Sequence, residues 1–299
     1  MLKIVAFEPE MAEGITRLYN ELIEPVPEFY PVPVERFASV EALASKWLRD
    51  ERVMVALDDG EVAGFVHVGV TRPVDDDPVP KGEPAAIRFL GYRVGQREVG
   101  RRLLAWVDDY AREQKRATIL AWHYFARYPF YHCPWGQLSA KMAHVRAVFG
   151  MYGYEDAGDS EMYFHWHDFE PPEAPTTPPE VELKPKWSDG ALGSRMVMRA
   201  VQGDERLGVC CMDRGQTSPH PDAADWCYCD WITVTEEHRG KRLGMLLLVN
   251  ALHEMKRAGC KHAAISTTWN NYRAALFYTN LGYRFADQTY SFKKECGAR

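Results

Sequence analysis

The sequence predicts an α/β protein of two tandem domains, each a mixed β-sheet layered with helices, in which the second domain lacks its first two helices. Three observations lead to this prediction. The chain has 299 residues, a length that favours two domains of ordinary size. A proline-rich stretch at residues 169–186 is typical of a stiff linker between domains 1–168 and 187–299, although a long surface loop inside one domain is the alternative. The order of elements before this stretch then recurs after it.

The sequence of the first domain predicts strands and helices in the order β-α-α-β-β-β-α-β-α-β. Apolar residues at helical spacing mark the helices, and Asp58-Asp59-Gly60 is a hairpin turn between two strands. The expected strands are residues 2–7, 53–57, 62–70, 86–94, 117–122 and 161–166, of which the last closes the domain, and the expected helices are residues 10–24, 39–52, 100–116 and 139–149.

The second domain repeats the later part of that order. Its opening strand, residues 181–184, is separated from the next strand by residues 185–194 alone, whereas residues 8–52 separate the matching strands of the first domain. That gap leaves no room for two helices. The expected strands are residues 181–184, 195–200, 207–212, 226–234, 262–267 and 289–293, and the expected helices are residues 243–258 and 272–280.

Composition excludes several classes of protein. Apolar residues make up 46% and charged residues 26%, as in ordinary globular proteins, and the net charge of -6 gives no overall footprint for nucleic acid. The longest apolar run, residues 243–248, is too short to span a membrane, and the N-terminus lacks a signal-peptide layout. The seven cysteines, an odd number, fit reduced buried thiols. We therefore expect a cytoplasmic protein, monomeric or homodimeric, without nucleic-acid or membrane partners.

A basic turn, Arg239-Gly240-Lys241-Arg242-Leu243-Gly244, lies between a strand and an apolar helix. Backbone N–H groups at such a helix start, together with nearby cations, favour an anion such as pyrophosphate. The turn is neither a P-loop nor a dinucleotide fingerprint. The alternative is a helix start whose arginines and lysine are merely solvated.

A second segment, residues 271–283, follows the next strand, and the two segments together resemble the signature motifs of the GNAT superfamily of acetyl-CoA-dependent N-acetyltransferases. The turn resembles the R/Q-x-x-G-x-G/A loop at Arg239 and Gly244 but carries Arg242 where a glycine is usual. The second segment resembles N-x-x-A-x-x-F-Y-x-x-x-G-F/Y at Asn271, Ala274, Phe277, Tyr278, Gly282 and Tyr283. The resemblance covers residues 195–295, and the order of elements extends it more weakly to residues 1–168.

This resemblance implies acetyl-CoA as co-substrate and no metal. The strand end Ile232, Thr233 and Val234 would bind the pantetheine arm through free backbone groups. The N–H groups of Arg239, Gly240, Lys241, Arg242, Leu243, Gly244 and Met245 would hold the pyrophosphate. Asn271 would contact the pantetheine or order the next helix, within a segment that also includes Ala274 and Phe277. The Tyr278 hydroxyl would protonate the CoA thiolate, and a core aromatic is the alternative role.

The attacking amine must lose a proton, so a base is expected. Asp230, on the strand before the turn, is the first candidate and Asp225 the second, although Asp230 is equally well explained as a solvated strand residue. Direct attack, with the oxyanion stabilised by a backbone N–H near Val234, would resemble the rest of the family.

The first domain has lost most of these residues. Aligning Gly100 with Gly244 leaves Gly95 in place of the leading arginine, and a second alignment sets Phe149 against Tyr278 and Met142 against Asn271. Phe149 has no proton to donate. We expect this domain to be catalytically degenerate, with CoA binding left open, and to supply part of the acceptor site that the shorter domain lacks.

Three other clusters carry weaker signals. The aromatic stretch 122–135 either lines an acceptor pocket or closes the core. Zinc at His123, His132 and Cys133 is not expected, because the spacing matches no structural site. Exposed strand ends explain His165 and His167 better than a metal, and Cys227 and Cys229 are expected as buried strand residues.

The expected function is therefore direct transfer of an acetyl group from acetyl-CoA to a primary amine of a small molecule or peptide. Two alternatives stay open: transfer of another acyl group, as in tandem enzymes resembling mycothiol synthase, and a non-catalytic CoA-binding regulatory module.

Overall fold

The chain folds into two compact units, which we describe separately. The computed structural model describes residues 1–74, 82–128, 130–131, 136–189, 193–215 and 220–296. Unit 1 comprises residues 1–160 and 288–299, and unit 2 comprises residues 161–287. These limits differ from the expected boundaries at residues 168 and 187, because each unit includes a strand from the far side of the proline-rich stretch.

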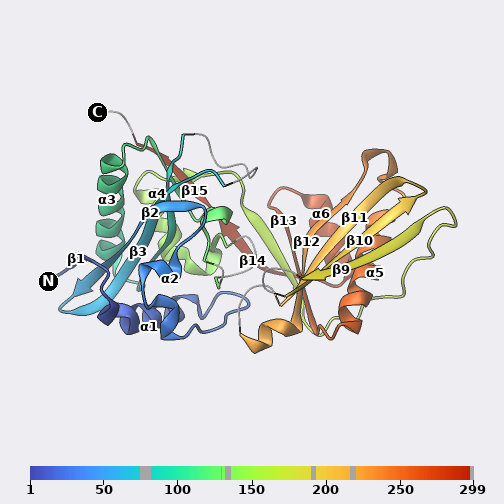
Figure 1. The fold of residues 1–299 in the computed structure, drawn as a ribbon, viewed down its shortest axis with the longest axis horizontal. Coiled ribbons are helices and arrows are strands. Elements are labelled where there is room, and N and C mark those ends of the chain that lie inside the picture. The colour runs from blue at the N-terminus through green and yellow to red at the C-terminus, as the bar shows by residue number, and fades with distance from the viewer. Residues whose placement is uncertain (75–81, 129, 132–135, 190–192, 216–219, 297–299) are drawn as a thin grey trace. The chain divides into compact units, whose positions relative to one another are not determined.

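Unit 1 is a mixed sheet with the strand order β1-β2-β3-β4-β5-β15-β7. Its core lies between the sheet and helices α1, α3 and α4 (Figure 1). The strands are β1 (Lys3–Ala6), β2 (Leu48–Asp58), β3 (Glu61–Thr71), β4 (Ala85–Tyr92), β5 (Thr118–Ala121), β6 (Leu138–Ser139), β7 (Glu155–Asp156) and β15 (Phe292–Glu295), and the helices are α1 (Ala12–Ile23), α2 (Val40–Leu43), α3 (Arg97–Glu113) and α4 (Ala143–Met151).

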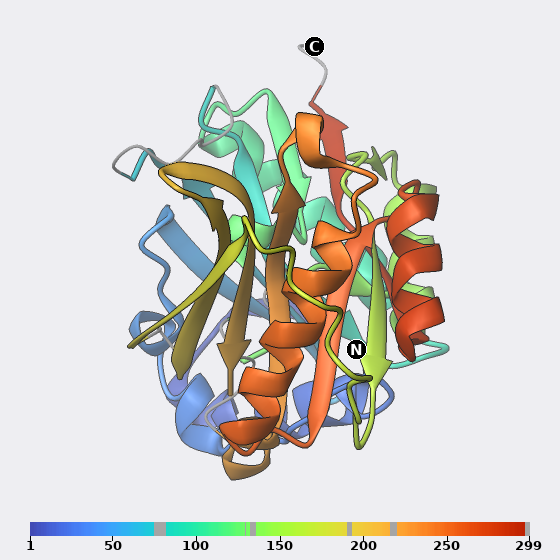
Figure 2. The same cartoon turned by 90° about the vertical axis from the view of Figure 1, so that its right-hand side faces the viewer.

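The second sheet has the strand order β6-β14-β8-β13-β12-β11-β10-β9, in which β6 and residues 288–290 of β14 belong to unit 1 and the remainder to unit 2. Helices α5 and α6 both lie against one face of this sheet (Figure 2). The strands are β8 (Glu161–Trp166), β9 (Glu182–Asp189), β10 (Ser194–Gln202), β11 (Glu205–Arg214), β12 (Trp226–Val234), β13 (His262–Thr268) and β14 (Arg284–Tyr290), and the helices are α5 (Leu243–Arg257) and α6 (Tyr272–Leu281).

The fold class predicted from the sequence is confirmed, including the two helices missing from the second copy. Strands β9 and β10 form an antiparallel pair in unit 2 and are separated by residues 190–193 only. Four residues suffice for a turn but not for a helical crossover. Unit 2 therefore has one sheet face without the two opening helices that unit 1 places between β1 and β2.

The two copies have exchanged their closing strands. Strand β8, expected to close the first domain, pairs antiparallel with β13 from Ala263–Trp166 to Thr268–Glu161. The strand expected to close the second domain, residues 289–293, instead spans the end of β14 and the start of β15, and β15 pairs with β5 and with β7 in unit 1. Alternating apolar patterns identify both segments as strands but carry no information about which partner strand each one joins.

Two further expectations are wrong in detail. The predicted helix 39–52 is the four-residue α2, and β2 already begins at Leu48, because residues 48–58 pair along β3. The predicted linker is also shorter than 169–186. Phe169 is fully buried in the core of unit 2, and residues 182–186 belong to β9.

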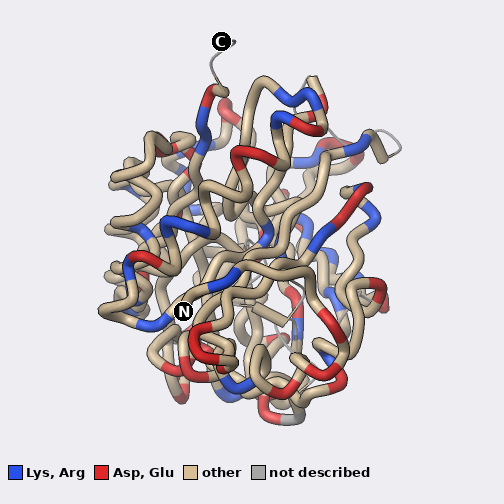
Figure 3. Tube along the Cα trace, turned by 90° about the vertical axis from the view of Figure 1, so that its left-hand side faces the viewer, with Lys and Arg blue, Asp and Glu red and all other residues tan. Residues whose placement is uncertain are grey.

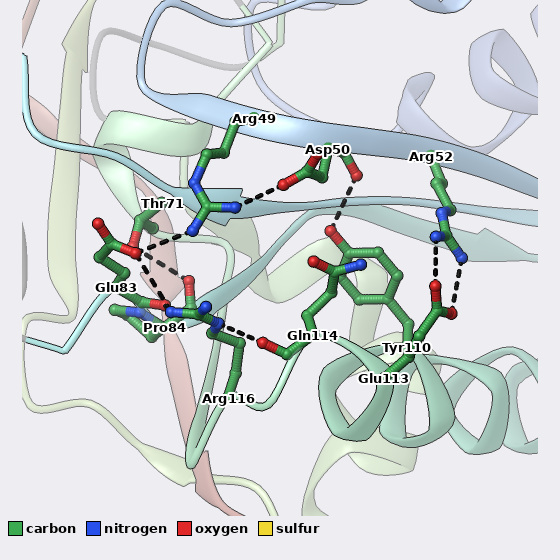
Figure 4. A network of polar contacts seen from close by, with 10 residues as sticks. All are labelled: Arg49, Asp50, Arg52, Thr71, Glu83, Pro84, Tyr110, Glu113, Gln114 and Arg116. Atoms are coloured by element: carbon green, nitrogen blue, oxygen red, sulfur yellow. Dashed lines mark hydrogen bonds and ion pairs between the residues drawn. The ribbon is translucent and has the colours of Figure 1, made fainter.

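Charged residues of both signs are mixed along the trace of unit 1 rather than segregated (Figure 3). Ion pairs tie α3 to β2 and the β3–β4 connection to β2 (Figure 4). Arg52 contacts both carboxylate oxygens of Glu113 at 2.9 and 2.6 Å, and the Tyr110 hydroxyl donates to the Asp50 carbonyl at 2.9 Å. Among the described residues, no helix is long and apolar enough to cross a membrane.

Candidate active site

The parallel strands β12 and β13 separate halfway along β12. Their pairing runs from Trp226–His262 to Cys229–Ile265 and ends there. Residues 231–234 of β12 continue to pair with β11 on the other side, up to Gly208–Val234. The edge of β12 that faces β13 is therefore unpaired along Ile232, Thr233 and Val234, the three residues predicted to hold a pantetheine arm, and the Val234 carbonyl accepts a hydrogen bond from the Arg239 Nε at 3.3 Å.

Asp230 is the extra residue of a β-bulge at the point of separation. Cys211 lies opposite Trp231 and Met212 lies opposite Cys229, so no residue of β11 lies opposite Asp230. A bulge redirects the side chain of its extra residue and is common beside active sites. The first-choice base predicted from the sequence thus lies where the strands part.

The basic turn after β12 is built to receive an anion. The N-cap residue of helix α5 is Arg242, whose side chain makes no capping hydrogen bond. The first N–H groups of the helix have no intrahelical acceptor either. Of the residues that the structure describes, a side chain at Gly244 would approach only the Val234 Cγ2, at 4.0 Å, and one at Gly240 would contact none within 4 Å. This open space beside uncapped N–H groups, with exposed Arg239, Lys241 and Arg242 around it, fits a phosphate group.

Arg242 adopts a left-handed backbone with φ 63° and ψ 10°. Residues other than glycine rarely adopt this conformation, because the Cβ atom crowds the following carbonyl. The sequence departs from the loop motif at this very position, and the backbone keeps the geometry that a glycine would adopt without strain.

Asn271 orders the start of α6. Its Oδ1 accepts a hydrogen bond from the Ala274 N–H at 3.3 Å, and its Nδ2 donates to the Thr267 Oγ1 at 2.9 Å. Helix α6 therefore begins at a fixed position at the end of β13, which sets where Tyr278 lies, seven residues after Asn271 and nearly two turns into the helix.

Tyr278 lies in the core of unit 2, with 4% of its surface exposed. Its ring packs edge-on against Phe164 of the exchanged strand β8, at a centroid distance of 5.9 Å, and against Tyr283 at 6.2 Å. Burial raises the pKa of Tyr278 well above its ordinary value, so the phenol keeps its proton at neutral pH. Ala274 and Phe277 also pack against this core.

A charged network on the opposite face of the sheet includes Asp230. Arg195 of β10 donates one hydrogen bond to the Asp230 Oδ2 and another to the Asp213 Oδ2, each at 2.6 Å. Sequence reasoning missed Arg195 and Asp213. The hairpin around Gln202–Glu205 indicates that β10 and β11 pair. However, a register shift between Ala200 and Val201 moves the pairing by one residue, so counting residues back from the turn does not place Asp213 opposite Arg195.

The second-choice base, Asp225, lies at the far end of β12. It precedes the strand, where its carboxylate pairs with Lys261 at 2.8 Å, and Asp230 lies five positions further along the chain, about 16 Å away. The structure therefore does not bring Asp225 to the point where β12 and β13 separate.

In unit 1 the parallel strands β4 and β5 also separate, but side chains fill the space that this leaves. The β4–β5 pairing ends at Ile87–Ala121. The Tyr92 hydroxyl then donates to the His144 carbonyl at 2.8 Å, while the His144 Nε2 lies 2.8 Å from the Tyr92 carbonyl oxygen. A side chain at Gly100, the counterpart of Gly244, would lie only 2.5 Å from the Tyr92 ring. Phe149, the counterpart of Tyr278, stacks on Phe292 in the core.

The weaker clusters have structural explanations where they are described. Trp122, Phe125, Tyr128 and Tyr131 are buried in unit 1, whereas residues 129 and 132–135 lie outside the described residues, including His132 and Cys133. His165 is buried against the Trp226 ring rather than exposed at a strand end. Cys227 and Cys229 are buried as expected, and the Cys229 sulfur lies 3.7 Å from that of Cys210.

Comparison with known proteins now adds a family. Residues 160–283 match the model of the acetyltransferase (GNAT) family. This range begins one residue before β8 and includes both the basic turn and α6. No curated protein matches the chain.

Solved structures match over the whole chain at low identity. A tandem GNAT protein from the clavulanic acid biosynthesis pathway, solved without AcCoA, is 16% identical, covers 100% of both chains and has a TM-score of 0.69. A GCN5-related N-acetyltransferase from Sphaerobacter thermophilus is 14% identical, covers 99% of this chain and 96% of its own, and has a TM-score of 0.66. At these identities the likeness shows the fold: two tandem copies of one α/β architecture.

Proposed function

We propose that this chain, whose residues 160–283 match the acetyltransferase (GNAT) family model, acts as an acetyltransferase, and that unit 2 transfers the acetyl group of acetyl-CoA directly to a primary amine of a small molecule or peptide. The observation that carries the proposal is the separation of β12 from β13 next to the uncapped start of α5. One feature offers backbone groups to an extended amide-containing arm, and the other offers N–H groups and cations to a pyrophosphate.

Each predicted residue has a role in holding the co-substrate. The backbone of Ile232, Thr233 and Val234 would bind the pantetheine, and the N–H groups from Arg239 to Met245 would bind the pyrophosphate. Asn271 acts through the helix that it caps. Because Gly240 and Gly244 leave open space over the turn, a phosphate can approach the backbone closely.

The proposed reaction balances with one acid and one base. The amine nitrogen forms a bond to the thioester carbonyl carbon, and the carbon–sulfur bond breaks. Asp230 takes the proton that the amine loses, and the Tyr278 hydroxyl gives its proton to the departing CoA thiolate. The raised pKa of buried Tyr278 supports its role as the acid, because the phenol is fully protonated before the reaction.

The buried thiols support a reducing, cytoplasmic compartment. The cysteines described in the structure are free, and four of them, Cys210, Cys227, Cys229 and Cys260, are buried in unit 2. Sulfurs as close as those of Cys210 and Cys229 remain thiols most readily where glutathione keeps the surroundings reducing.

The test is release of free CoA from acetyl-CoA in the presence of a panel of primary amines. We expect amine-dependent release by the wild type and a loss of about 10² to 10³ in kcat for Tyr278→Phe. Tyr283→Phe is the matched control, because Tyr283 lies in the same core and its buried hydroxyl has no hydrogen-bond partner among the described residues, so it should leave kcat unchanged.

Two outcomes would favour the alternatives. Turnover with a different acyl-CoA but not with acetyl-CoA would indicate transfer of another acyl group. Tight CoA binding without turnover of any acyl donor would indicate a regulatory binding module and overturn the proposal.

A further inference from the structure

Unit 2 exposes a large aromatic side chain at a sheet position that unit 1 buries. In both units a bulge fixes the correspondence: Phe89 lies opposite His67 next to the bulge in β4, and Trp231 lies opposite Cys211 next to the bulge in β12. Phe89 is fully buried under Tyr19 of α1, at a centroid distance of 5.2 Å, whereas Trp231 is 57% exposed. The helices missing from unit 2 account for the difference.

The Arg195 network lies on this same uncovered face. Along β10, the residues Met196, Met198 and Ala200 are buried towards α5, so Arg195 points to the other side. Asp213 and Asp230 meet Arg195 there, from β11 and from the bulge in β12. The open face of unit 2 thus presents Trp231 and two carboxylates held by one guanidinium.

The charges in this network do not cancel. Two carboxylates and one guanidinium leave a formal charge of one negative unit. The side chains are only partly exposed, at 34% for Arg195, 19% for Asp213 and 27% for Asp230, so solvent screens the remaining charge incompletely. The other titratable groups on this face are Arg199 of β10, the β9 residues Lys186, Lys184 and Glu182, which lie opposite Val197, Arg199 and Val201, and Cys211, whose thiol pKa is raised by burial despite the proximity of Arg195.

We propose that Arg195 is a positioning residue that holds Asp213 and Asp230 side by side on the open face beside Trp231, an inference that rests on the proposed function. As a consequence, unit 2 prefers acceptors that carry a second positive charge. Asp230 then serves the reacting amine while Asp213 and the face of the Trp231 ring attract the second ammonium group. A guanidinium that contacts both carboxylates fixes their separation, which an isolated aspartate at a bulge would not do.

The experiment compares two acceptors of matched length, 1,4-diaminobutane and n-butylamine, with the full-length protein and acetyl-CoA. The wild type should show a kcat/KM about tenfold higher for the diamine. In Arg195→Met the network becomes more negative, but the two carboxylates lose the group that fixes their separation, so the preference should fall if that separation determines it. The acidic limb of the pH profile of kcat/KM should move, while the KM for acetyl-CoA stays unchanged. Arg195→Lys should keep part of the preference, because it keeps the charge but not the two-pronged contact.

Arg199→Met is the matched control, because Arg199 lies on the same face of the same strand, four residues further along. It should leave the preference and the pH profile unchanged. Asp213→Asn provides a second variant that keeps the shape of the network, and it should lower the preference without moving the KM for acetyl-CoA.

The outcomes separate the two proposals. Absence of amine-dependent turnover in the wild type overturns the proposed function and this inference with it. Wild-type turnover with the same preference and pH profile in Arg195→Met and Asp213→Asn overturns this inference alone and leaves the proposed function standing.

Discussion

Arg88 and Asp230 occupy the same bulge position in the two sheets and carry opposite charges. The partner is inverted as well: Arg88 lies 3.3 Å from the Glu51 carboxylate on β2, and Asp230 lies 2.6 Å from Arg195 on β10. Arg88 also donates to the carbonyl oxygens of Ala126 and Arg127, which fixes it as a buried part of the fold. An arginine has no lone pair with which to accept a proton, so unit 1 has no base at this position.

In unit 1 the space where β4 and β5 separate is filled by side chains, so we predict that each chain binds one CoA. Tyr92 and His144 bond to each other's backbone carbonyl groups, and the Tyr92 ring fills the space beside Gly100 that stays open beside Gly244. Calorimetric titration of the full chain with CoA should give a stoichiometry near one. Arg239→Ala should weaken that binding, and Arg97→Ala, at the start of the matching helix in unit 1, should not. Binding of two equivalents of CoA per chain would show that the space between β4 and β5 of unit 1 opens to admit a second CoA.

The left-handed backbone of Arg242 predicts opposite effects on stability and on binding. Arg242→Gly relieves a strain of about 1 to 2 kcal/mol, partly offset by about 0.5 to 1 kcal/mol of glycine entropy, so the free energy of unfolding should rise by up to about 1.5 kcal/mol. CoA affinity should fall, because a cation beside the phosphate site is lost. Arg242→Ala separates the two effects: it should lose the same affinity but gain no stability in chemical denaturation.

The exchanged strands predict that a nicked chain stays together. A protease site introduced at Thr176, in the irregular segment between β8 and β9, divides the chain into fragments that each keep a strand belonging to the other unit's sheet. Size-exclusion chromatography without denaturant should show both fragments in one peak. Separation of the fragments would contradict the exchange.

The same exchange predicts that residues 187–299 do not fold alone. This fragment lacks β8, so β13 loses its antiparallel partner and the Tyr278 ring loses its contact with Phe164. We expect an insoluble or unfolded product by circular dichroism. A soluble fragment with native-like secondary structure would show that the sheet of unit 2 tolerates the loss of β8.

A buried histidine predicts that unit 1 loses stability in mild acid. Burial lowers the pKa of His67 from 6.5 to about 4, although the nearby Glu51 carboxylate, 3.0 Å away, opposes the shift. Between these pH values the unfolded chain binds a proton that the folded chain does not, so stability is complete above about pH 6.5 and falls as the pH drops towards 4. The loss amounts to about 3 kcal/mol at most.

Denaturation curves at pH 7 and pH 5 check this prediction. The pH dependence should shrink in His67→Gln and persist in His253→Gln, where the replaced histidine lies on α5 and bonds the Pro172 carbonyl. An unchanged pH dependence in His67→Gln would assign the acid sensitivity to other groups.

The sequence by itself determined the α/β class, the tandem arrangement, the two missing helices and the placement of the basic turn and of residues 271–283 at helix starts. These features follow from local periodicity, from turn and capping residues and from the length of connections, all of which are encoded within short stretches. Only the tertiary structure decided which sheet contains residues 161–166 and 292–295. The same holds for the contacts of Arg195 with Asp213 and Asp230, and for the Tyr92 side chain that fills the space where β4 and β5 separate. Each of these depends on pairing between segments far apart in the chain, and an alternating strand pattern is compatible with more than one partner and register.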